Sequence, residues 1–120
     1  MTVALSKTDI QSFNNDGVVV LRGVFKEWID ILIRGAEFHI NNPSSSALVH
    51  QEKSYQGHFM EDFCNWNRIP QYQDFVLNSP LASLAAELTE SKSVQFFHQT
   101  RTYNLSCSQT EIHGNEESAL

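Results

Sequence analysis

The sequence predicts an α+β fold in which short helices alternate with a few strands. Apolar residues recur at three- and four-residue spacing over residues 26–41, which is typical of an amphipathic helix. The apolar runs at residues 18–21 and 94–97 have no such spacing and are rich in valine or phenylalanine, which indicates strands. A chain of 120 residues with 41% hydrophobic residues is long enough for one small domain but not for two.

The first element is predicted to be a short helix that begins after Ser6. Ser6 is a favourable N-cap residue, and the carboxylate of Asp9 can accept a hydrogen bond from the cap amide, as in a capping box. Ile10 and Phe13 form the apolar side of this helix. Gly17 favours the left-handed conformation that ends many helices, so we expect the helix to end there.

The predicted strand at residues 18–21 ends at Gly23, and the longer helix at residues 26–41 follows it. Pro43 and the three serines after it indicate a loop beyond this helix. Residues 49–67 are irregular and rich in aromatic side chains. This composition favours a packed loop with short strands over a further helix.

Two more short helices are predicted in the second half of the chain. Pro70 can open the first of them, and the pair Ser79–Pro80 is typical of a cap followed by the first turn of the second. The strand at residues 94–97 comes next. Tyr103 and Leu105 can continue strand structure before a polar stretch without periodicity.

Composition excludes several classes of partner and compartment. The formal net charge is -6 and the eight basic residues are scattered, whereas nucleic-acid binding requires clustered Lys and Arg. No apolar window is long enough to span a membrane, and the N-terminus lacks the pattern of a signal peptide. Two cysteines, Cys64 and Cys107, are too few for a disulfide framework, so we expect reduced thiols in a cytoplasmic protein. Neither has a basic neighbour in sequence that would activate it as a nucleophile.

The histidines give little support to a metal site. His39 falls within the longer helix and is expected on its surface or partly packed. His50, His58 and Asp62 could bind zinc or iron only if the irregular segment folded back on itself. Because no compact spacing such as H-x-x-x-H is present, we favour the absence of such a site.

Five segments carry a family resemblance over about four-fifths of the chain. They are, in order, residues 5–25 (LSKTDIQSFNNDGVVVLRGVF), the helix that contains Trp28, residues 57–66 (GHFMEDFCNW), residues 69–86 (IPQYQDFVLNSPLASLAA) and residues 88–98 (LTESKSVQFFH). In order and spacing they resemble the phytanoyl-CoA dioxygenase family, whose members are iron(II)- and 2-oxoglutarate-dependent dioxygenases.

The resemblance implies a double-stranded β-helix, or jelly roll, that is incomplete in this chain. Residues 1–98 would supply its N-terminal helices and first strands, and residues 99–120 a divergent, poorly ordered tail. The resemblance also implies Fe(II) held by two histidines and one carboxylate, with 2-oxoglutarate as cosubstrate and a small organic molecule as substrate. By the same analogy, Tyr55, Phe59 and Trp66 would lie at the substrate entrance; the alternative for these aromatic residues is ordinary packing.

The sequence departs from the family pattern after His98. Residues 99–109 contain no Lys-Glu-Pro-Gly phrase, and the nearest match to the metal-binding H-x-D motif is HGN at residues 113–115. His113 is therefore the only candidate metal ligand, because Asn115 has no anionic oxygen, although Glu116 is adjacent. No second metal histidine or cosubstrate arginine follows. We therefore expect a truncated, inactive form without catalytic or cofactor-binding residues of its own.

Two origins of the tail and two functions stay open at this point. The tail is either a shifted reading frame or alternative exon, or a drifted sequence in which His113 descends from a true ligand. The chain is either an inactive relative of the dioxygenases or a non-catalytic interaction module that depends on a partner. In the second case, uncovered sheet edges would favour self-association.

Overall fold

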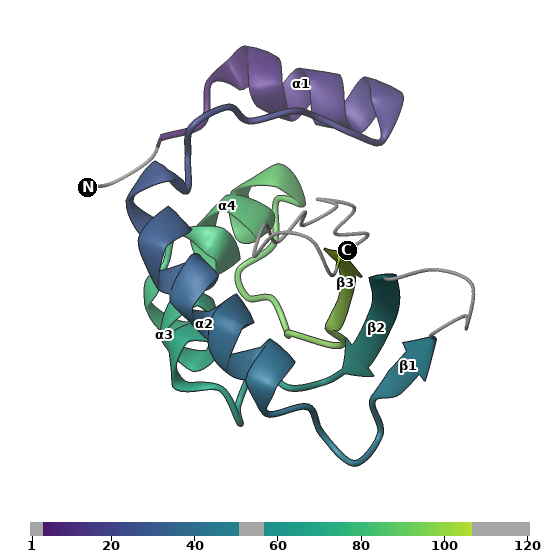
Figure 1. Ribbon diagram of the computed structural model, residues 1–120. Coiled ribbons are helices and arrows are strands. Elements are labelled where there is room, and N and C mark those ends of the chain that lie inside the picture. The colour runs from purple at the N-terminus through teal and green to yellow at the C-terminus, as the bar shows by residue number, and fades with distance from the viewer. Residues whose placement is uncertain (1–3, 51–56, 107–120) are drawn as a thin grey trace.

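The computed structural model describes residues 4–50 and 57–106 and has the mixed α+β architecture that the sequence predicts (Figure 1). Four α-helices and three strands are present in the described part of the chain. In chain order they are α1 (Lys7–Asp16), the 3-10 turn η1 (Lys26–Trp28), α2 (Ile29–Asn41), β1 (Leu48–His50), β2 (Gly57–Phe63), α3 (Pro70–Asn78), α4 (Leu81–Leu88) and β3 (Thr100–Ser106). No described helix has both the length and the apolar character needed to cross a bilayer.

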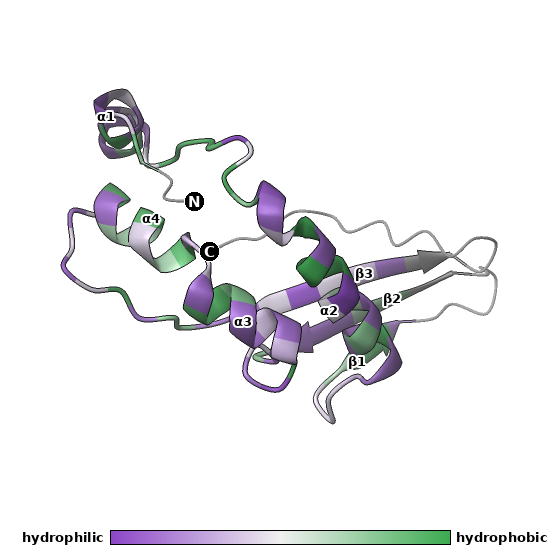
Figure 2. Ribbon diagram, turned by 90° about the vertical axis from the view of Figure 1, so that its left-hand side faces the viewer, coloured by the Kyte–Doolittle hydropathy of each residue, from purple (hydrophilic) through white to green (hydrophobic). Residues whose placement is uncertain are grey.

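The three strands form one open antiparallel sheet in the order β1-β2-β3. Met60 of β2 lies opposite Val49 of β1 and Tyr103 of β3. Because side chains alternate between the two faces of a strand, Met60 and Tyr103 share a face with Asp62 and Arg101. This face is turned toward α2 and α3, whereas α1 is set apart from the sheet and packs against α4 (Figures 1 and 2).

The predicted capping signals of α1 are confirmed. The Ser6 hydroxyl accepts a hydrogen bond from the Asp9 amide at 3.1 Å, and the Asp9 carboxylate accepts one from the Ser6 amide at 3.0 Å. Gly17 ends α1 with φ 73°, and its amide donates to the Phe13 carbonyl at 2.8 Å. The predicted start of α4 is wrong by one residue: Pro80 rather than Ser79 is the N-cap, and Leu81 begins the helix, with its amide donating to the Ser79 hydroxyl at 3.2 Å. The residues that begin and end these helices act locally, which explains why the sequence locates them well.

Two predicted strands are wrong. Residues 18–21 and 94–97 adopt no regular secondary structure and pair with no strand in the described part of the chain. Val18 and Val20 are 64% and 70% exposed, so the apolar run packs against little. A strand exists only where a neighbouring strand accepts and donates its backbone hydrogen bonds, and high β-propensity does not supply that neighbour.

The core lies between α2, α3 and the helix-facing side of the sheet. Ala36 of α2 packs on Met60 and Tyr103, with Ile40 at the margin of the cluster. Figure 2 shows both apolar and polar residues on α2, and three of its apolar side chains stay exposed: Ile29, Ile33 and Phe38. The fully buried side chains include the polar residues His39, Asp62 and Asn65, so much of the interior is polar.

Gly35 allows α2 and α3 to approach closely. A Cβ atom at this position would lie 2.7 Å from Cε1 of Tyr72 in α3, closer than real Cβ contacts allow. The ring of Tyr72 therefore packs directly on the backbone of α2. From there its hydroxyl reaches the buried polar residues between the helices and the sheet.

Candidate functional site

Five side chains from four elements form a polar cluster under α2, which we call the His39 network: His39, Asp62, Tyr72, Arg101 and Tyr103. Nε2 of His39 lies 2.8 Å from Oδ2 of Asp62, and its Nδ1 lies 2.9 Å from the hydroxyl of Tyr103. The hydroxyls of Tyr103 and Tyr72 are 2.6 Å apart. The prediction that His39 lies on the helix surface or partly packed is wrong, because the residue is 0% exposed.

The fold explains why these residues meet. Asp62 on β2 and Arg101 on β3 are register partners, as are Met60 and Tyr103, so both pairs point to the helix-facing side of the sheet. His39 is one turn beyond the Ala36 that packs on this face.

A neutral His39 satisfies the hydrogen bonds that join it to Asp62 and Tyr103 and, through Tyr103, to Tyr72. In that state Nε2–H donates to Asp62, the Tyr103 hydroxyl donates to Nδ1, and the Tyr72 hydroxyl donates to the Tyr103 oxygen. Burial is the largest influence on the pKa of His39 and lowers it, and together with the charges of Arg68 and Arg101 it outweighs the hydrogen bond and charge of Asp62, which raise the pKa. The neutral imidazole is therefore the form that this structure favours.

Asp62 is the anion of the network. Burial alone would raise its pKa, but hydrogen bonds from Ser44 and His39 outweigh burial and hold the pKa well below its usual range. The carboxylate accepts bonds from the Ser44 amide at 2.8 Å and the Ser44 hydroxyl at 2.5 Å, as well as from the Phe63 amide at 2.9 Å. It thus joins the loop before β1 to the end of β2.

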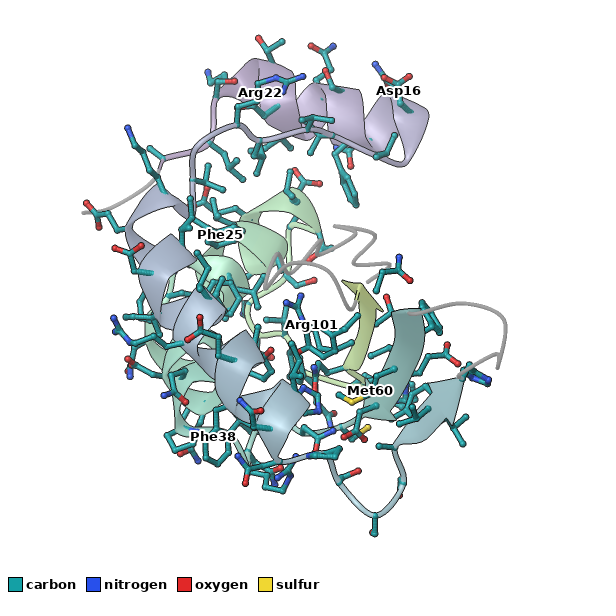
Figure 3. All side chains as sticks on the ribbon, in the orientation of Figure 1. Asp16, Arg22, Phe25, Phe38, Met60 and Arg101 are labelled. Atoms are coloured by element: carbon teal, nitrogen blue, oxygen red, sulfur yellow. The ribbon has the colours of Figure 1, made fainter. Side chains whose placement is uncertain are left out.

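Arg101 lies between the sheet and the helices (Figure 3). Its guanidinium carbon is 5.6 Å from the ring centroids of both Tyr72 and Tyr103, which is cation–π distance. Its Nε is buried and has no hydrogen-bond partner among the described atoms. Burial raises the pKa of Tyr72, and the neighbouring Tyr103 raises it further, so the Tyr72 phenol keeps its proton.

The chemistry open to the His39 network is limited by burial. Protons can redistribute along the chain from Tyr72 through Tyr103 to His39, because adjacent donors and acceptors are 2.6 to 2.9 Å apart. His39, Asp62 and Tyr103 are each 0% exposed and Tyr72 is 4% exposed, so none of them offers a surface to a substrate. The network as described holds α2, α3 and the sheet together.

A second polar pair lies at the surface, where β2 ends. Sγ of Cys64 is 3.3 Å from Nδ1 of His98, and the residues are 34 positions apart in the sequence. Cys64 is an exposed free cysteine. The basic neighbour of Cys64 is His98, which the chain brings back beside it just before β3. It is therefore not a neighbour in sequence. No local sequence pattern indicates this partner.

The aromatic residues predicted at a substrate entrance lie on different parts of the described structure. Phe59 stacks near His50, with ring centroids 5.9 Å apart, and Trp66 packs edge-on against Phe96 at 5.5 Å. Phe59 lies within β2 and Trp66 beyond its end. Tyr55 falls outside the described residues, so the entrance assignment stays a prediction.

The possible metal ligands are not brought together in the part described. His50 contacts Glu61 on one face of the sheet, whereas Asp62 faces α2 on the other. Among the described residues no group of three His, Cys, Asp or Glu could hold a metal ion. The side chain of His58 and the whole of His113 lie outside the described part of the chain.

Comparison with known proteins assigns no family to the chain. No protein-family model matches its sequence, and searches of the curated proteins and of the solved structures give no significant match.

Proposed function

We propose that this chain forms the N-terminal part of a jelly-roll domain of the iron(II)- and 2-oxoglutarate-dependent dioxygenase type. In this proposal the described residues supply scaffold and one wall of the domain, and the metal ligands come from elsewhere. The reaction of such a domain is hydroxylation of a small organic substrate.

The observation that carries the proposal is the open face of the sheet. The side chains that point away from α2 and α3 are Leu48, His50, Phe59, Glu61, Phe63, Thr100, Thr102 and Asn104. None of them is buried. An antiparallel sheet can leave one face in water, so this face is open to a second layer. In a jelly roll that layer is a second sheet about 10 Å away.

The composition of the open face also supports its role as one wall of a ligand cavity. Along β2 the aromatic residues Phe59 and Phe63 alternate with the polar Glu61, and polar residues of β3 lie opposite all three: Asn104, Thr102 and Thr100. A packed interface between two sheets is mainly apolar, whereas a ligand pocket combines apolar walls with a few polar groups.

The described residues do not fit the ferrous site that the proposed family requires. The one buried histidine–carboxylate pair, His39 and Asp62, has both imidazole nitrogens and the carboxylate engaged with protein groups. It therefore has no free lone pair to offer a metal. No catalytic step is assigned to the described residues.

The proposal is tested first by activity. The purified chain is incubated with Fe(II), a reductant and 2-oxoglutarate, and succinate is measured beside a His113→Ala variant. We expect no succinate above the variant. Succinate formation that depends on iron and 2-oxoglutarate in the parent alone would contradict the role given to these residues.

The family assignment itself is tested by the nucleotide sequence beyond codon 98. Read in the other two frames, it is expected to encode a Lys-Glu-Pro-Gly phrase, an H-x-D motif and, later, a histidine and an arginine. Absence of these motifs from every frame would remove the support for a dioxygenase origin.

A second function, partner-dependent interaction, is favoured by one specific observation. Phe97 is 92% exposed and adjoins His98, which stacks near Phe63 of the open face at 6.2 Å. A phenylalanine this exposed, continuous with an uncovered sheet face, is typical of an association surface. Its test is the oligomeric state.

A further inference from the structure

The Cys64–His98 pair has a geometry that neither the His39 network nor the proposed jelly roll uses. The thiol and the imidazole are within hydrogen-bond distance, and both residues are at the surface. Cys64 directly follows β2 and His98 lies just before β3, at the end of the strand pair where Phe63 is opposite Thr100. A thiol beside a base is the minimal arrangement for nucleophilic sulfur chemistry.

Several contacts fix the pair in place. The Cys64 amide donates to the Gln99 carbonyl at 2.7 Å, and the Asn65 amide donates to the side-chain carbonyl of Gln99 at 2.8 Å. The ring of His98 lies between those of Phe63 and Phe97, at centroid distances of 6.2 and 6.4 Å. The two segments are thereby held in register, and the thiol meets the imidazole without a large search of side-chain conformations.

The backbone of Cys64 adds to this positioning. Its φ is 53°, in the left-handed region that a residue with a Cβ adopts at a cost of about 1–2 kcal/mol. The hydrogen bonds to Gln99 keep it there. The conformation turns the chain sharply at the end of β2 and leaves the thiol at the surface rather than under α2.

We propose that Cys64 and His98 form a thiol–imidazole pair that undergoes thiol–disulfide exchange with small-molecule disulfides. Nδ1 of His98 accepts the thiol proton, and the Sγ thiolate attacks one sulfur of the disulfide. A Cys64–S–S–R bond forms as the R–S–S–R bond breaks, and the leaving thiolate takes the proton from His98 to become a free thiol. Cys64 is oxidised to the mixed disulfide, and half of the incoming disulfide is reduced.

The exposure of the pair is the reason to propose a disulfide as the reactant. Exchange requires the attacked sulfur and the leaving sulfur to line up with Sγ, which needs open space in front of the thiol. Cys64 provides that space, whereas a buried cysteine would not. In the proposal His98 does not contact the disulfide; it positions the Cys64 thiol and accepts its proton.

The test measures the rate of mixed-disulfide formation with oxidised glutathione at pH 7 by intact mass spectrometry. The full chain carries Cys107→Ser, so that Cys64 is the only thiol. His98→Gln keeps a hydrogen-bonding side chain but removes the base, and is expected to slow the reaction by about tenfold or more. The matched control is His50→Gln, which changes another exposed histidine that lies beside Glu61 and is expected to leave the rate unchanged.

A second measurement keeps the test decisive if His98→Gln fails to fold. The parent is compared with itself in denaturing urea, where Cys64 and His98 no longer meet. We expect the folded parent to react about tenfold faster than its denatured form. Equal rates in folded and denatured parent, or in parent and a folded His98→Gln variant, would overturn the proposal.

Discussion

Asp62 joins more parts of the molecule than any other residue of the His39 network. It accepts hydrogen bonds from the Ser44 amide and hydroxyl, the His39 ring and the Phe63 amide. In Asp62→Asn, the new amide group would face some of these donors with a donor of its own. Loss of the buried charge and of its bonds is expected to lower the free energy of unfolding by about 2–4 kcal/mol. Urea denaturation followed by circular dichroism measures the change.

The matched control is Asp74→Asn. Asp74 bonds only to Asn78, one turn later on the surface of α3, so its replacement is expected to change the free energy of unfolding by about 0.5 kcal/mol or less. Equal effects of the two substitutions would show that Asp62 does not organise the interior.

The His39 network also determines how stability depends on pH. Because burial lowers the pKa of His39, the unfolded chain, in which histidine has a pKa of about 6.5, binds the proton more readily than the folded chain. Stability is therefore expected to fall as the pH decreases below about 6.5. The depressed pKa of Asp62 contributes stability above about pH 4 that is lost as the pH falls further.

Free energies of unfolding measured from pH 8 to pH 3 test this dependence. The parent is expected to lose stability both below about pH 6.5 and below about pH 4. The His39→Gln variant should lack mainly the first of these two decreases in stability. A parent that is most stable near pH 5 would contradict the neutral buried histidine.

Neither the His39 network nor the Cys64–His98 pair could be predicted from the sequence. His39 follows Phe38 in a helix whose apolar stripe is complete without it, and its partners Asp62 and Tyr103 are 23 and 64 positions away. The Cys64–His98 contact spans 34 positions. Such pairs form only when strand register is known, and register is a tertiary property that local patterns do not specify.

At the scale of elements, the packing of α2 on α3 depends on Gly35. Alanine is a better helix former than glycine by about 1 kcal/mol, so Gly35→Ala would stabilise an isolated helix. Here the added methyl group would meet the Tyr72 ring at 2.7 Å, and displacing that ring disturbs its bond to Tyr103. We expect a net loss of about 1–2 kcal/mol, seen as a lower midpoint in thermal unfolding.

The control for Gly35→Ala is the neighbouring Arg34→Ala, at an exposed position of the same helix. Because this side chain faces solvent, the thermal midpoint should stay nearly unchanged. A higher midpoint for Gly35→Ala would mean that the two helices do not pack as closely as described.

Helices and strands differed in how far the sequence could predict them. The capping box at Ser6 and the glycine at position 17 determine the ends of α1 by contacts within a few residues. The apolar runs at residues 18–21 and 94–97 have strand propensity but no strand beside them. Tyr103 was placed in a strand by the sequence, and the pairing of β3 with β2 confirms it.

For the whole molecule, we predict that the one-sided sheet favours self-association. Helices cover one face, the other carries no buried side chain, and Phe97 adjoins it almost fully exposed. An uncovered face of this kind lowers its free energy by burying apolar surface against a second molecule. The proposed jelly roll and the alternative interaction module both lead to this expectation.

Sedimentation velocity over a range of concentrations tests whether the chain associates with itself. We expect the parent to dimerise, and Phe97→Ser to weaken dimerisation by about tenfold or more, because burial of a phenylalanine contributes about 1.5–3 kcal/mol. The control Val20→Ser removes an exposed apolar side chain from the segment between α1 and α2 and should leave dimerisation unchanged. A parent that is monomeric at every concentration and unfolds in one sharp transition would instead show that the open face is stable in water, because no partner copy is then needed to cover it.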